Sequence, residues 1–317
     1  MRLLPPETPF EARLIASSVV RGARLHDSHG GLCIVDCRSG ELDWVLDWSS
    51  PDIDVEERGG DRGLRGVGIA GDQLYVLSSV ALIRFDRHLR MQATYRNPYL
   101  KHCHELSIYA GRAYLVSTGY DAIVVFDLAT ERFVTGVHLA SVNGALRATT
   151  FDPASSAGPA PSHAFHLNSV MHTDAGLFFS GLRTGGLLRI ADSRLSLAAP
   201  LPGGTHNAQP FGDGVIYNDT ERNSLCAKFS GREIRLPVTA DPAASARWQL
   251  ADDARLARPL FARGLCPLST RLVAAGSSPS TVSIYDLQEQ RLLAQVELSH
   301  DVRNAVHGLA IWPWPTR

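Results

Sequence analysis

Short apolar runs alternate with polar turns along the chain, and they fall into a repeating block. Each block opens with a brief apolar run, continues with a run rich in β-branched and aromatic residues, and closes with a third run that ends in aspartate. The clearest copy covers residues 104–127, and other copies start at residues 66, 166, 206 and 264. Short runs of this kind between turn residues predict β-strands rather than helices.

The block recurs roughly every 40 residues apart from two longer intervals, a period typical of β-propeller blades. The C-terminus supplies only a first run, at residues 307–312, and the N-terminus supplies only later ones, between residues 13 and 46. Joined, they make a sixth unit. The sequence therefore predicts an all-β fold, a six-bladed β-propeller closed by strands from both termini. A seventh blade would have to lie within a longer interval.

We expect one propeller domain over residues 1–317. The two longer intervals place insertions at about residues 140–164 and 230–262. Both fall in connections that lead into an innermost strand, so we expect them to lie over the mouth of the central channel and to act as lids.

Composition narrows the class of protein. Hydrophobic residues make up 44% of the chain and charged residues 20%, which is ordinary for a globular protein. The 31 basic and 32 acidic residues nearly cancel, which argues against a nucleic-acid partner. Apolar runs are too short for a membrane span, and residues 1–6 lack the apolar core of a secretory signal. The five cysteines lack disulfide-framework spacing. We expect a soluble cytoplasmic protein that acts on a small molecule.

Four histidines share one position of the repeat. When the blades are aligned at their first strand, this position holds histidine in four blades and an Arg-Gly glycine in the other two. Innermost strands surround the channel of a propeller, so these imidazoles should converge. A repeated packing histidine and a metal-free histidine-lined site are the alternatives. We favour a metal site made by His104, His166, His206 and His307.

An all-imidazole donor set favours one divalent transition metal and disfavours Ca²⁺ and Mg²⁺, which prefer oxygen ligands. We expect Fe(II), with Zn, Cu or Ni as alternatives. Cys266 lies two residues beyond Gly264 and is either a thiol in the same channel or a small buried hydrophobe. Glu105 follows His104, and strand alternation would turn it to the opposite face, so we do not count it as a ligand.

Polar residues gather at the turns that should lie beside the histidines. Arginine forks suit carboxylates and phosphates, which makes an anionic substrate plausible. Neighbouring asparagines would orient it, and an acid or a tyrosine would serve as a base. Turn capping and solvation are the plainer alternatives. The expected substrate-binding residues are Arg65, Arg263, Arg183, Arg222, Asn168, Asn207 and Cys266, and the candidate catalytic residues are Tyr120, Asp219 and Glu221.

An aspartate closes the third run in most blocks. Recurrence of one residue type between blades indicates turn chemistry rather than catalysis. The residues concerned are Asp36, Asp86, Asp127, Asp192 and Asp286.

Residues 96–104, 165–170, 204–207 and 263–267 resemble a group of bacterial propeller proteins of unknown function. The resemblance runs over most of the chain and implies the fold without an activity. The histidine set is architecturally similar to that of carotenoid-cleavage oxygenases, which hold a non-haem iron with four histidines. It is also similar to that of oligogalacturonate lyases, which hold a divalent metal mainly with histidines. The local motifs of these two families do not match, so the similarity is one of architecture.

The leading hypothesis is a metal-dependent enzyme, an iron oxidoreductase that oxidises or oxygenates a small molecule. Four neutral ligands would leave the charge of the ion uncompensated, which favours an anionic substrate. A lyase or hydrolase that uses the metal as a Lewis acid is the second hypothesis. A non-enzymatic propeller that binds a ligand or a protein is the third.

Overall fold

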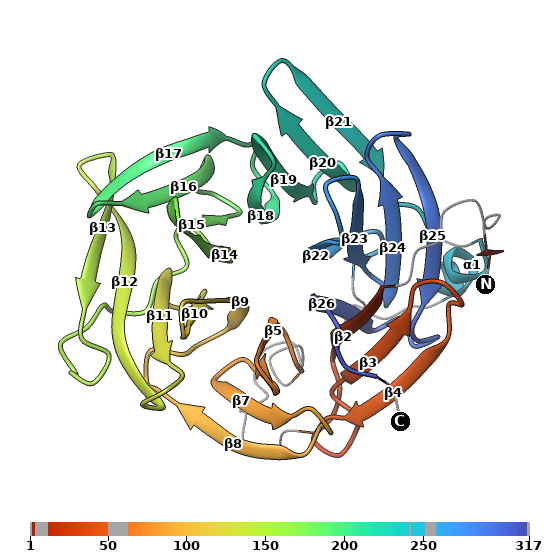
Figure 1. Ribbon diagram of the computed structural model, residues 1–317, viewed down its shortest axis with the longest axis horizontal. Coiled ribbons are helices and arrows are strands. Elements are labelled where there is room, and N and C mark those ends of the chain that lie inside the picture. Colours follow the sequence, from red (N-terminus) through yellow and green to blue (C-terminus); the bar gives the residue numbers. More distant parts are fainter. Residues whose placement is uncertain (1, 4–11, 50–62, 241, 251–257, 316–317) are drawn as a thin grey trace. The chain divides into compact units, whose positions relative to one another are not determined.

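The computed structural model describes residues 2–3, 12–49, 63–240, 242–250 and 258–315. Within these residues the chain forms 26 strands and one helix. The strands make six antiparallel sheets of four or five strands, and this architecture is the six-bladed β-propeller that the sequence predicts (Figure 1). No helix in this part of the chain is both long and apolar enough to cross a membrane.

Five of the sheets follow the chain order of their strands. One contains β5 (Val67–Ala70), β6 (Gln73–Leu77), β7 (Ala81–Asp86) and β8 (Met91–Arg96). The next contains β9 (Cys103–Tyr109), β10 (Arg112–Ser117), β11 (Ala122–Asp127), β12 (Arg132–Val142) and β13 (Ala145–Phe151). Then come β14 (Leu167–Thr173), β15 (Gly176–Gly181), β16 (Gly186–Ala191) and β17 (Arg194–Pro200). The fourth contains β18 (Thr205–Phe211), β19 (Gly214–Asp219), β20 (Ser224–Phe229) and β21 (Arg232–Pro237). The fifth contains β22 (Ala262–Pro267), β23 (Leu272–Ser277), β24 (Thr281–Asp286) and β25 (Arg291–Glu297), with β1 (Arg2–Leu3) added at its edge.

The sixth sheet joins the two ends of the chain. It contains β26 (Asn304–Ile311), β2 (Arg13–Val20), β3 (Gly31–Asp36) and β4 (Leu42–Asp47), in that order. In the β2–β26 ladder Leu14 lies opposite Ile311 and Val20 lies opposite Asn304. The predicted closure by strands from both termini is therefore confirmed.

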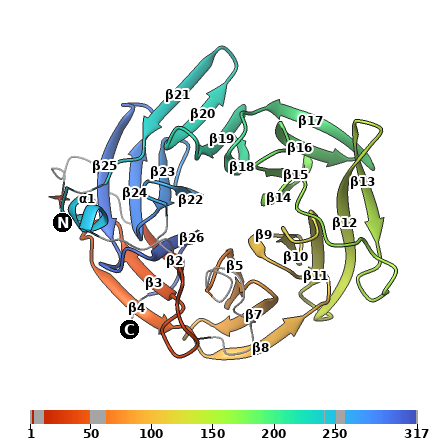
Figure 2. The ribbon, with the colours of Figure 1, turned by 180° about the vertical axis from the view of Figure 1, so that it is seen from behind.

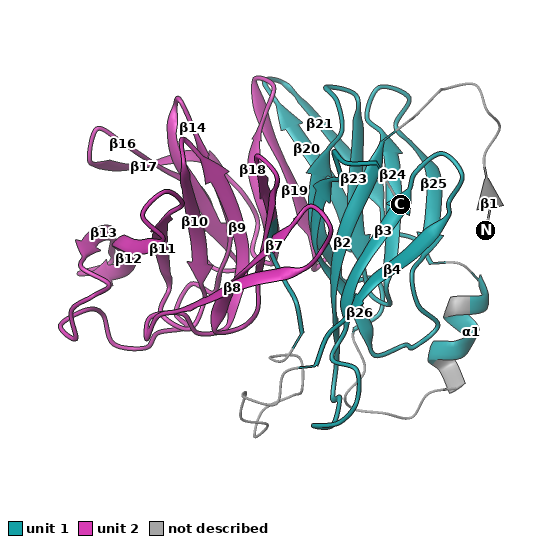
Figure 3. Cartoon of the chain, turned by 60° about the horizontal axis from the view of Figure 1, so that its bottom comes forward, with its two compact units in different colours: residues 1–67, 222–317 teal, residues 68–221 magenta. Residues whose placement is uncertain are grey.

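The chain divides into two compact units (Figure 3). Unit 1 consists of residues 1–67 and 222–317, and unit 2 consists of residues 68–221. Unit 2 thus holds the middle of the chain, and unit 1 holds both of its ends.

Central strands of unit 2 are apolar on both faces because each face packs in a separate core cluster. On β10, Ala113 and Leu115 belong to one cluster, while Tyr114 and Val116 belong to the next. Since side chains alternate along a strand, one nearly continuous apolar run serves both clusters. This explains why the sequence shows apolar runs here and not a simple polar–apolar alternation.

The aspartates that close the third strands stabilise turns, as predicted. Asp127 Oδ1 accepts hydrogen bonds from the amides of Ala129 and Thr130, at 3.2 and 2.9 Å. These hydrogen bonds lower the pKa of Asp127, and the bond from the Thr130 amide has the largest effect. Asp192 differs, since its backbone has a left-handed φ of 49°. Equivalent amide bonds are made by Asp36, Asp86 and Asp286.

The first predicted insertion begins with strand residues. Residues 140–142 end β12 and residues 145–151 form β13, which is the strand farthest from β9 in its sheet. In this part the chain therefore continues the sheet outward, and the role of the insertion as a lid stays a prediction. Beyond it, the hydroxyl of Tyr99 donates to the carbonyl of Ser155 and accepts from the amide of Gly158, both at 2.7 Å.

The second insertion, residues 230–262, contains β21, the helix α1 (Pro242–Leu250) and the start of β22. Residues 241 and 251–257 of this insertion, and residues 1 and 4–6 at the N-terminus, lie outside the described residues.

We expect Asp286→Asn to lower the free energy of unfolding by about 1–3 kcal/mol. The fully buried Asp286 carboxylate accepts the Nε–H of Arg271 at 2.9 Å, and this bond, the largest effect, lowers its pKa. A lowered folded-state pKa gives stability that is present above the unfolded value of about 4 and is lost as the pH falls further.

Urea unfolding between pH 7 and pH 3 tests this. The gap between the wild type and Asp286→Asn should narrow as the medium becomes acidic. The control is Asp127→Asn, which changes a more exposed turn carboxylate. A gap that stays constant through this range would contradict the assignment.

Candidate metal centre

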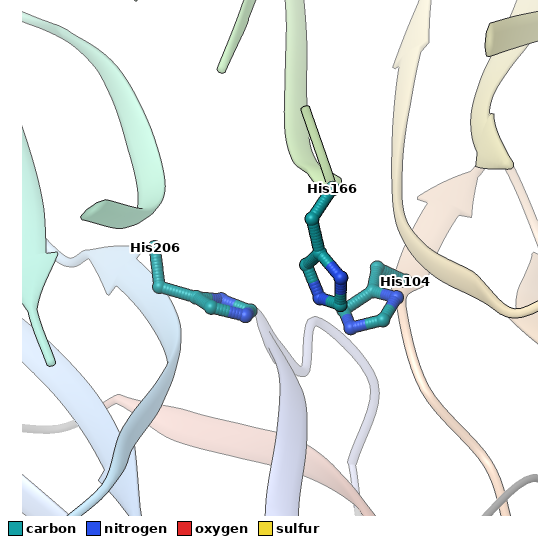
Figure 4. Close-up of side chains that lie close together, drawn as sticks. All are labelled: His104, His166 and His206. Atoms are coloured by element: carbon teal, nitrogen blue, oxygen red, sulfur yellow. The ribbon is translucent and has the colours of Figure 1, made fainter. Parts of the chain in front are cut away.

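Three of the four predicted histidines come together in unit 2. His104 lies on β9, His166 immediately precedes β14, and His206 lies on β18. Their ligand atoms all lie within 4.8 Å of one another, so the three rings could hold one metal ion (Figure 4). His104 and His206 are buried, with 8% and 2% of their surface exposed, and His166 is half-buried.

The three strands that position these histidines are neighbours. β14 lies beside both β9 and β18 in both views of the ribbon (Figures 1 and 2). The imidazole centroid of His104 is 5.0 Å from that of His166 and 5.6 Å from that of His206. The repeat alignment therefore identified residues that are equivalent in three successive blades and that meet in space.

A β-bulge lies at or next to each histidine. The β9–β10 ladder skips between Leu106 and Cys103, and the β18–β19 ladder skips between His206 and Gln209. The β14–β15 ladder skips after Leu167. A bulge breaks the strict alternation of a strand and re-aims side chains, so residues next to a histidine can turn to the same side.

The bend before β14 depends on a close approach of two backbones. His166 has a left-handed φ of 52°. A Cβ atom on Gly181 would lie only 2.6 Å from the His166 carbonyl oxygen. Only glycine therefore permits β15 to pass so near to His166.

Hydrogen bonds select the tautomer of His104. Its Nδ1 lies 3.0 Å from the carbonyl oxygen of His102, and a carbonyl can only accept. Nδ1 also lies 2.8 Å from the hydroxyl of Thr118, which donates its own proton to the carbonyl of Leu167. Nδ1 therefore carries the hydrogen, and Nε2 has the lone pair that a metal requires.

His206 is oriented in the same way by a side-chain amide. Its Nδ1 lies 3.1 Å from Oδ1 of Asn207. Asn218 Nδ2 donates to the same oxygen at 3.3 Å, and Asn207 Nδ2 donates to Glu105 Oε2 at 3.0 Å. These partners fix the Asn207 amide with its oxygen toward His206. Nε2 of His206 is therefore the atom that can bind a metal.

Glu105 lies in this network, although strand alternation predicts that it faces away. The bulge in β9 explains the difference. The pKa of Glu105 is raised to about 8, and burial of its carboxyl group is the largest cause. Hydrogen bonds from the Leu106 amide and from Asn207 act in the opposite direction and lower this pKa. The sequence carries no mark of the bulge, so the link from Glu105 through Asn207 to His206 could not be predicted from it.

Asn168 and Asn207 are predicted to bind substrate. In the structure Asn168 contacts the neighbouring strand β18, and Asn207 contacts His206. Asn168 is fully buried, and its Nδ2 donates to the carbonyl of Thr205 at 2.9 Å, which ties β14 to β18. Arg183 is exposed and its Nε donates to the carbonyl of Ala164 at 2.6 Å, so it holds the end of the first insertion.

The three candidate catalytic residues have different environments. Tyr120 packs edge-to-face on Tyr99, with ring centroids 5.4 Å apart, beside a hydrophobic cluster. Asp219 is fully buried at the end of β19, opposite Thr205. Glu221 is exposed. Their roles in catalysis stay predictions.

The other predicted residues lie in unit 1. His307 is buried on β26, and its Nε2 is 3.1 Å from Nη1 of Arg263. Arg65 is buried, Arg222 is exposed, and Cys266 belongs to a hydrophobic core cluster. The assignment of His307 as a fourth metal ligand stays a prediction.

Comparisons with known proteins concern the fold. A chain of a nidogen/laminin complex matches over 94% of this chain and 98% of its own length, with a TM-score of 0.58 and 8% identity. The computationally designed Ika8 protein matches over 92% and 89%, with a TM-score of 0.49 and 10% identity. A catalytically inactive virginiamycin B lyase from Staphylococcus aureus, in complex with quinupristin, matches over 78% and 74%, with a TM-score of 0.48 and 10% identity.

The first of these matches supports the propeller fold over nearly the whole chain. No protein-family model matches the sequence, and no curated protein matches it either. The resemblance to a bacterial propeller group therefore stays an expectation.

We expect Asn207→Ala to weaken metal binding by about 10- to 100-fold, because loss of an outer partner of a ligating histidine has effects of this size. Titration of the purified protein with Co(II), followed by its visible absorption, measures the affinity. Asn97→Ala is the control, since Asn97 Nδ2 binds the carbonyl of Pro153 and not a histidine. Equal affinities in both variants would refute the role of Asn207.

Proposed function

We propose that this protein is a metal-dependent enzyme whose ion is held by His104, His166 and His206. One observation carries the proposal: the three ligand atoms lie within 4.8 Å, and oxygen acceptors hold the Nδ1 hydrogens of His104 and His206. A histidine repeated only for packing has no need of ring nitrogens that converge. This arrangement of outer hydrogen bonds is the one that metal-ligating histidines use in proteins.

Three neutral imidazoles leave the ion with its full charge and with open coordination positions. Both properties favour binding of an anionic or polarisable small molecule. His307, predicted from the repeat as a fourth neutral ligand, would leave that charge unchanged. The chain's own contribution is to orient the rings, through the carbonyl of His102 and the amide of Asn207.

Iron-dependent oxidation or oxygenation of a small molecule is the reaction that we propose first. Imidazole nitrogen suits Fe(II), and open positions on the ion are what this chemistry requires. A bound iron would supply redox chemistry that no side chain can perform. The histidines would hold the ion, and the buried outer residues would keep their rings in place.

A lyase or hydrolase is the second candidate, and the donor set is the observation that favours it. Three histidines with an open fourth position form a common catalytic zinc site, in which the metal acts as a Lewis acid. A base beside the metal would then be needed. Separate substitutions of Tyr120, Asp219 and Glu221 that abolish turnover but retain the metal would support this candidate.

Elemental analysis of tag-free protein tests the site. We expect close to one equivalent of a transition metal in the wild type and loss of most of it in His166→Ala and His206→Ala. The control is His172→Ala. His172 lies on β14, the strand that begins directly after His166, but its ring packs against Tyr109 and Tyr114.

Iron bound to the purified protein, together with dioxygen consumption, would support the oxidoreductase, and zinc would support the second candidate. Failure to bind metal even after anaerobic reconstitution with Fe(II) would refute both. A non-enzymatic binding propeller would then be the better interpretation.

His307→Ala tests the fourth ligand. In unit 1 the guanidinium of Arg263 can only donate, so Nε2 of His307 accepts its hydrogen. We therefore expect His307→Ala to weaken Co(II) binding less than His206→Ala does. Equal losses in the two variants would show that His307 is a full ligand.

A further inference from the structure

Arg263 occupies a bulge in β22, the innermost strand of its sheet. The β22–β23 ladder skips from Ala262 to Leu265, so Arg263 and Gly264 lie in the bulge. Gly264 has a φ of 75°, and a Cβ there would lie 2.9 Å from the carbonyl oxygen of His307. The glycine thus lets β22 approach β26 and brings Arg263 next to His307.

Arg65 reaches the same part of unit 1 through its backbone. The hydroxyl of Ser17 donates to the carbonyl of Arg65 and accepts from the amide of Gly308 at 2.8 Å. This hydroxyl therefore joins Arg65 to the residue that follows His307. Arg65 itself is buried, with 3% of its surface exposed.

The contacts of the Arg263 guanidinium are not those of an ordinary ion pair. Its Nη1 donates to Nε2 of His307 at 3.1 Å, and its central carbon lies 4.3 Å from the ring centroid of Phe261. Arg258 stacks on the same ring at 4.6 Å. The buried Nε of Arg263 has no hydrogen-bond partner among the residues that the structure describes. The contacts with His307 and Phe261 therefore supply no negative charge to balance the guanidinium.

Neighbouring arginines add further positive charge around Arg263. Arg21, Arg65 and Arg258 lie close enough to act on Arg263. Burial first, and their repulsion second, hold the pKa of Arg263 well below its usual value. A guanidinium does not lose its proton in a protein, so the group stays charged and needs compensation. By contrast, Arg271 of the same unit binds both oxygens of Asp286, each at 2.9 Å from its Nε.

We infer that Arg263, with Arg65 and Arg258 beside it, binds an oxyanion: the carboxylate or the phosphate group of a small molecule. Guanidinium forks match the geometry of both groups. His307 keeps Nη1 in place by accepting its hydrogen, and Phe261 supports the planar faces of Arg258 and Arg263. The inference rests on unit 1 alone and does not require the metal. It goes beyond the proposed function, because it assigns a separate anion-binding site to unit 1.

Thermal unfolding of EDTA-treated protein tests this inference. Inorganic phosphate and acetate are titrated separately, with sodium chloride at the same ionic strength as the reference. At a large excess over its Kd, an anion that binds only the folded protein should raise the Tm by several degrees. A response to phosphate assigns a phosphate group, and a response to acetate assigns a carboxylate.

Substitutions locate the anion. Arg263→Met should weaken binding by about 10- to 100-fold, as expected for loss of a charged hydrogen-bonding fork. In chloride alone its Tm should equal or exceed that of the wild type, because an uncompensated, half-buried charge has been removed. Arg263→Lys, which keeps the charge but not the fork, is the second variant if Arg263→Met fails to fold, and it should also weaken binding.

Arg271→Met is the matched control. It should lower the Tm, because it leaves the Asp286 carboxylate without its partner, yet it should keep the full response to the anion. The inference is overturned if neither anion raises the Tm above the chloride reference, or if Arg263→Met retains the response. Since every measurement is made without metal, loss of metal binding in the histidine variants would leave this result unaffected.

Discussion

A bulge in the innermost strand of a blade is the constraint on which the candidate sites depend. In a regular strand, adjacent side chains point to opposite faces, and His104 would be separated from Glu105. The bulges in β9 and β18 relax this alternation. As a result, Glu105 meets Asn207, and Asn207 in turn holds the ring of His206. The same irregularity in β22 directs Arg263 toward His307.

Each unit contains polar groups, buried or half-buried, that we propose bind an ion. In unit 2 the groups are neutral: three imidazoles whose ligand atoms converge and whose outer hydrogens on His104 and His206 are already bound. In unit 1 they are cationic, since Arg263 is surrounded by an aromatic ring, a neutral histidine and other arginines. Burying such groups costs stability unless they acquire a partner. A cation would stabilise the first arrangement, and an anion would stabilise the second.

Much of the fold could be predicted because propeller blades repeat. The apolar runs, the aspartates at the third strands and the incomplete blocks at the two ends led to six blades closed by both termini. His104, His166 and His206 were found by the same route, since equivalent positions of successive blades lie on neighbouring strands. The blade repeat did not predict that residues 145–151 pair with β12 as a further strand, because this strand has no counterpart in the repeated block.

The sequence by itself determined the repeat, and the repeat determined which residues are equivalent. It could not determine which neighbours of those residues share their side of the strand, because a bulge has no sequence signature and depends on packing between sheets. The tertiary structure decided that Glu105 and Asn207 stand behind His206, and that Arg263 lies against Phe261 and His307. The local sequence pattern reveals the repeat, whereas hydrogen-bond partners and the surroundings of a buried charge depend on residues far apart in the chain.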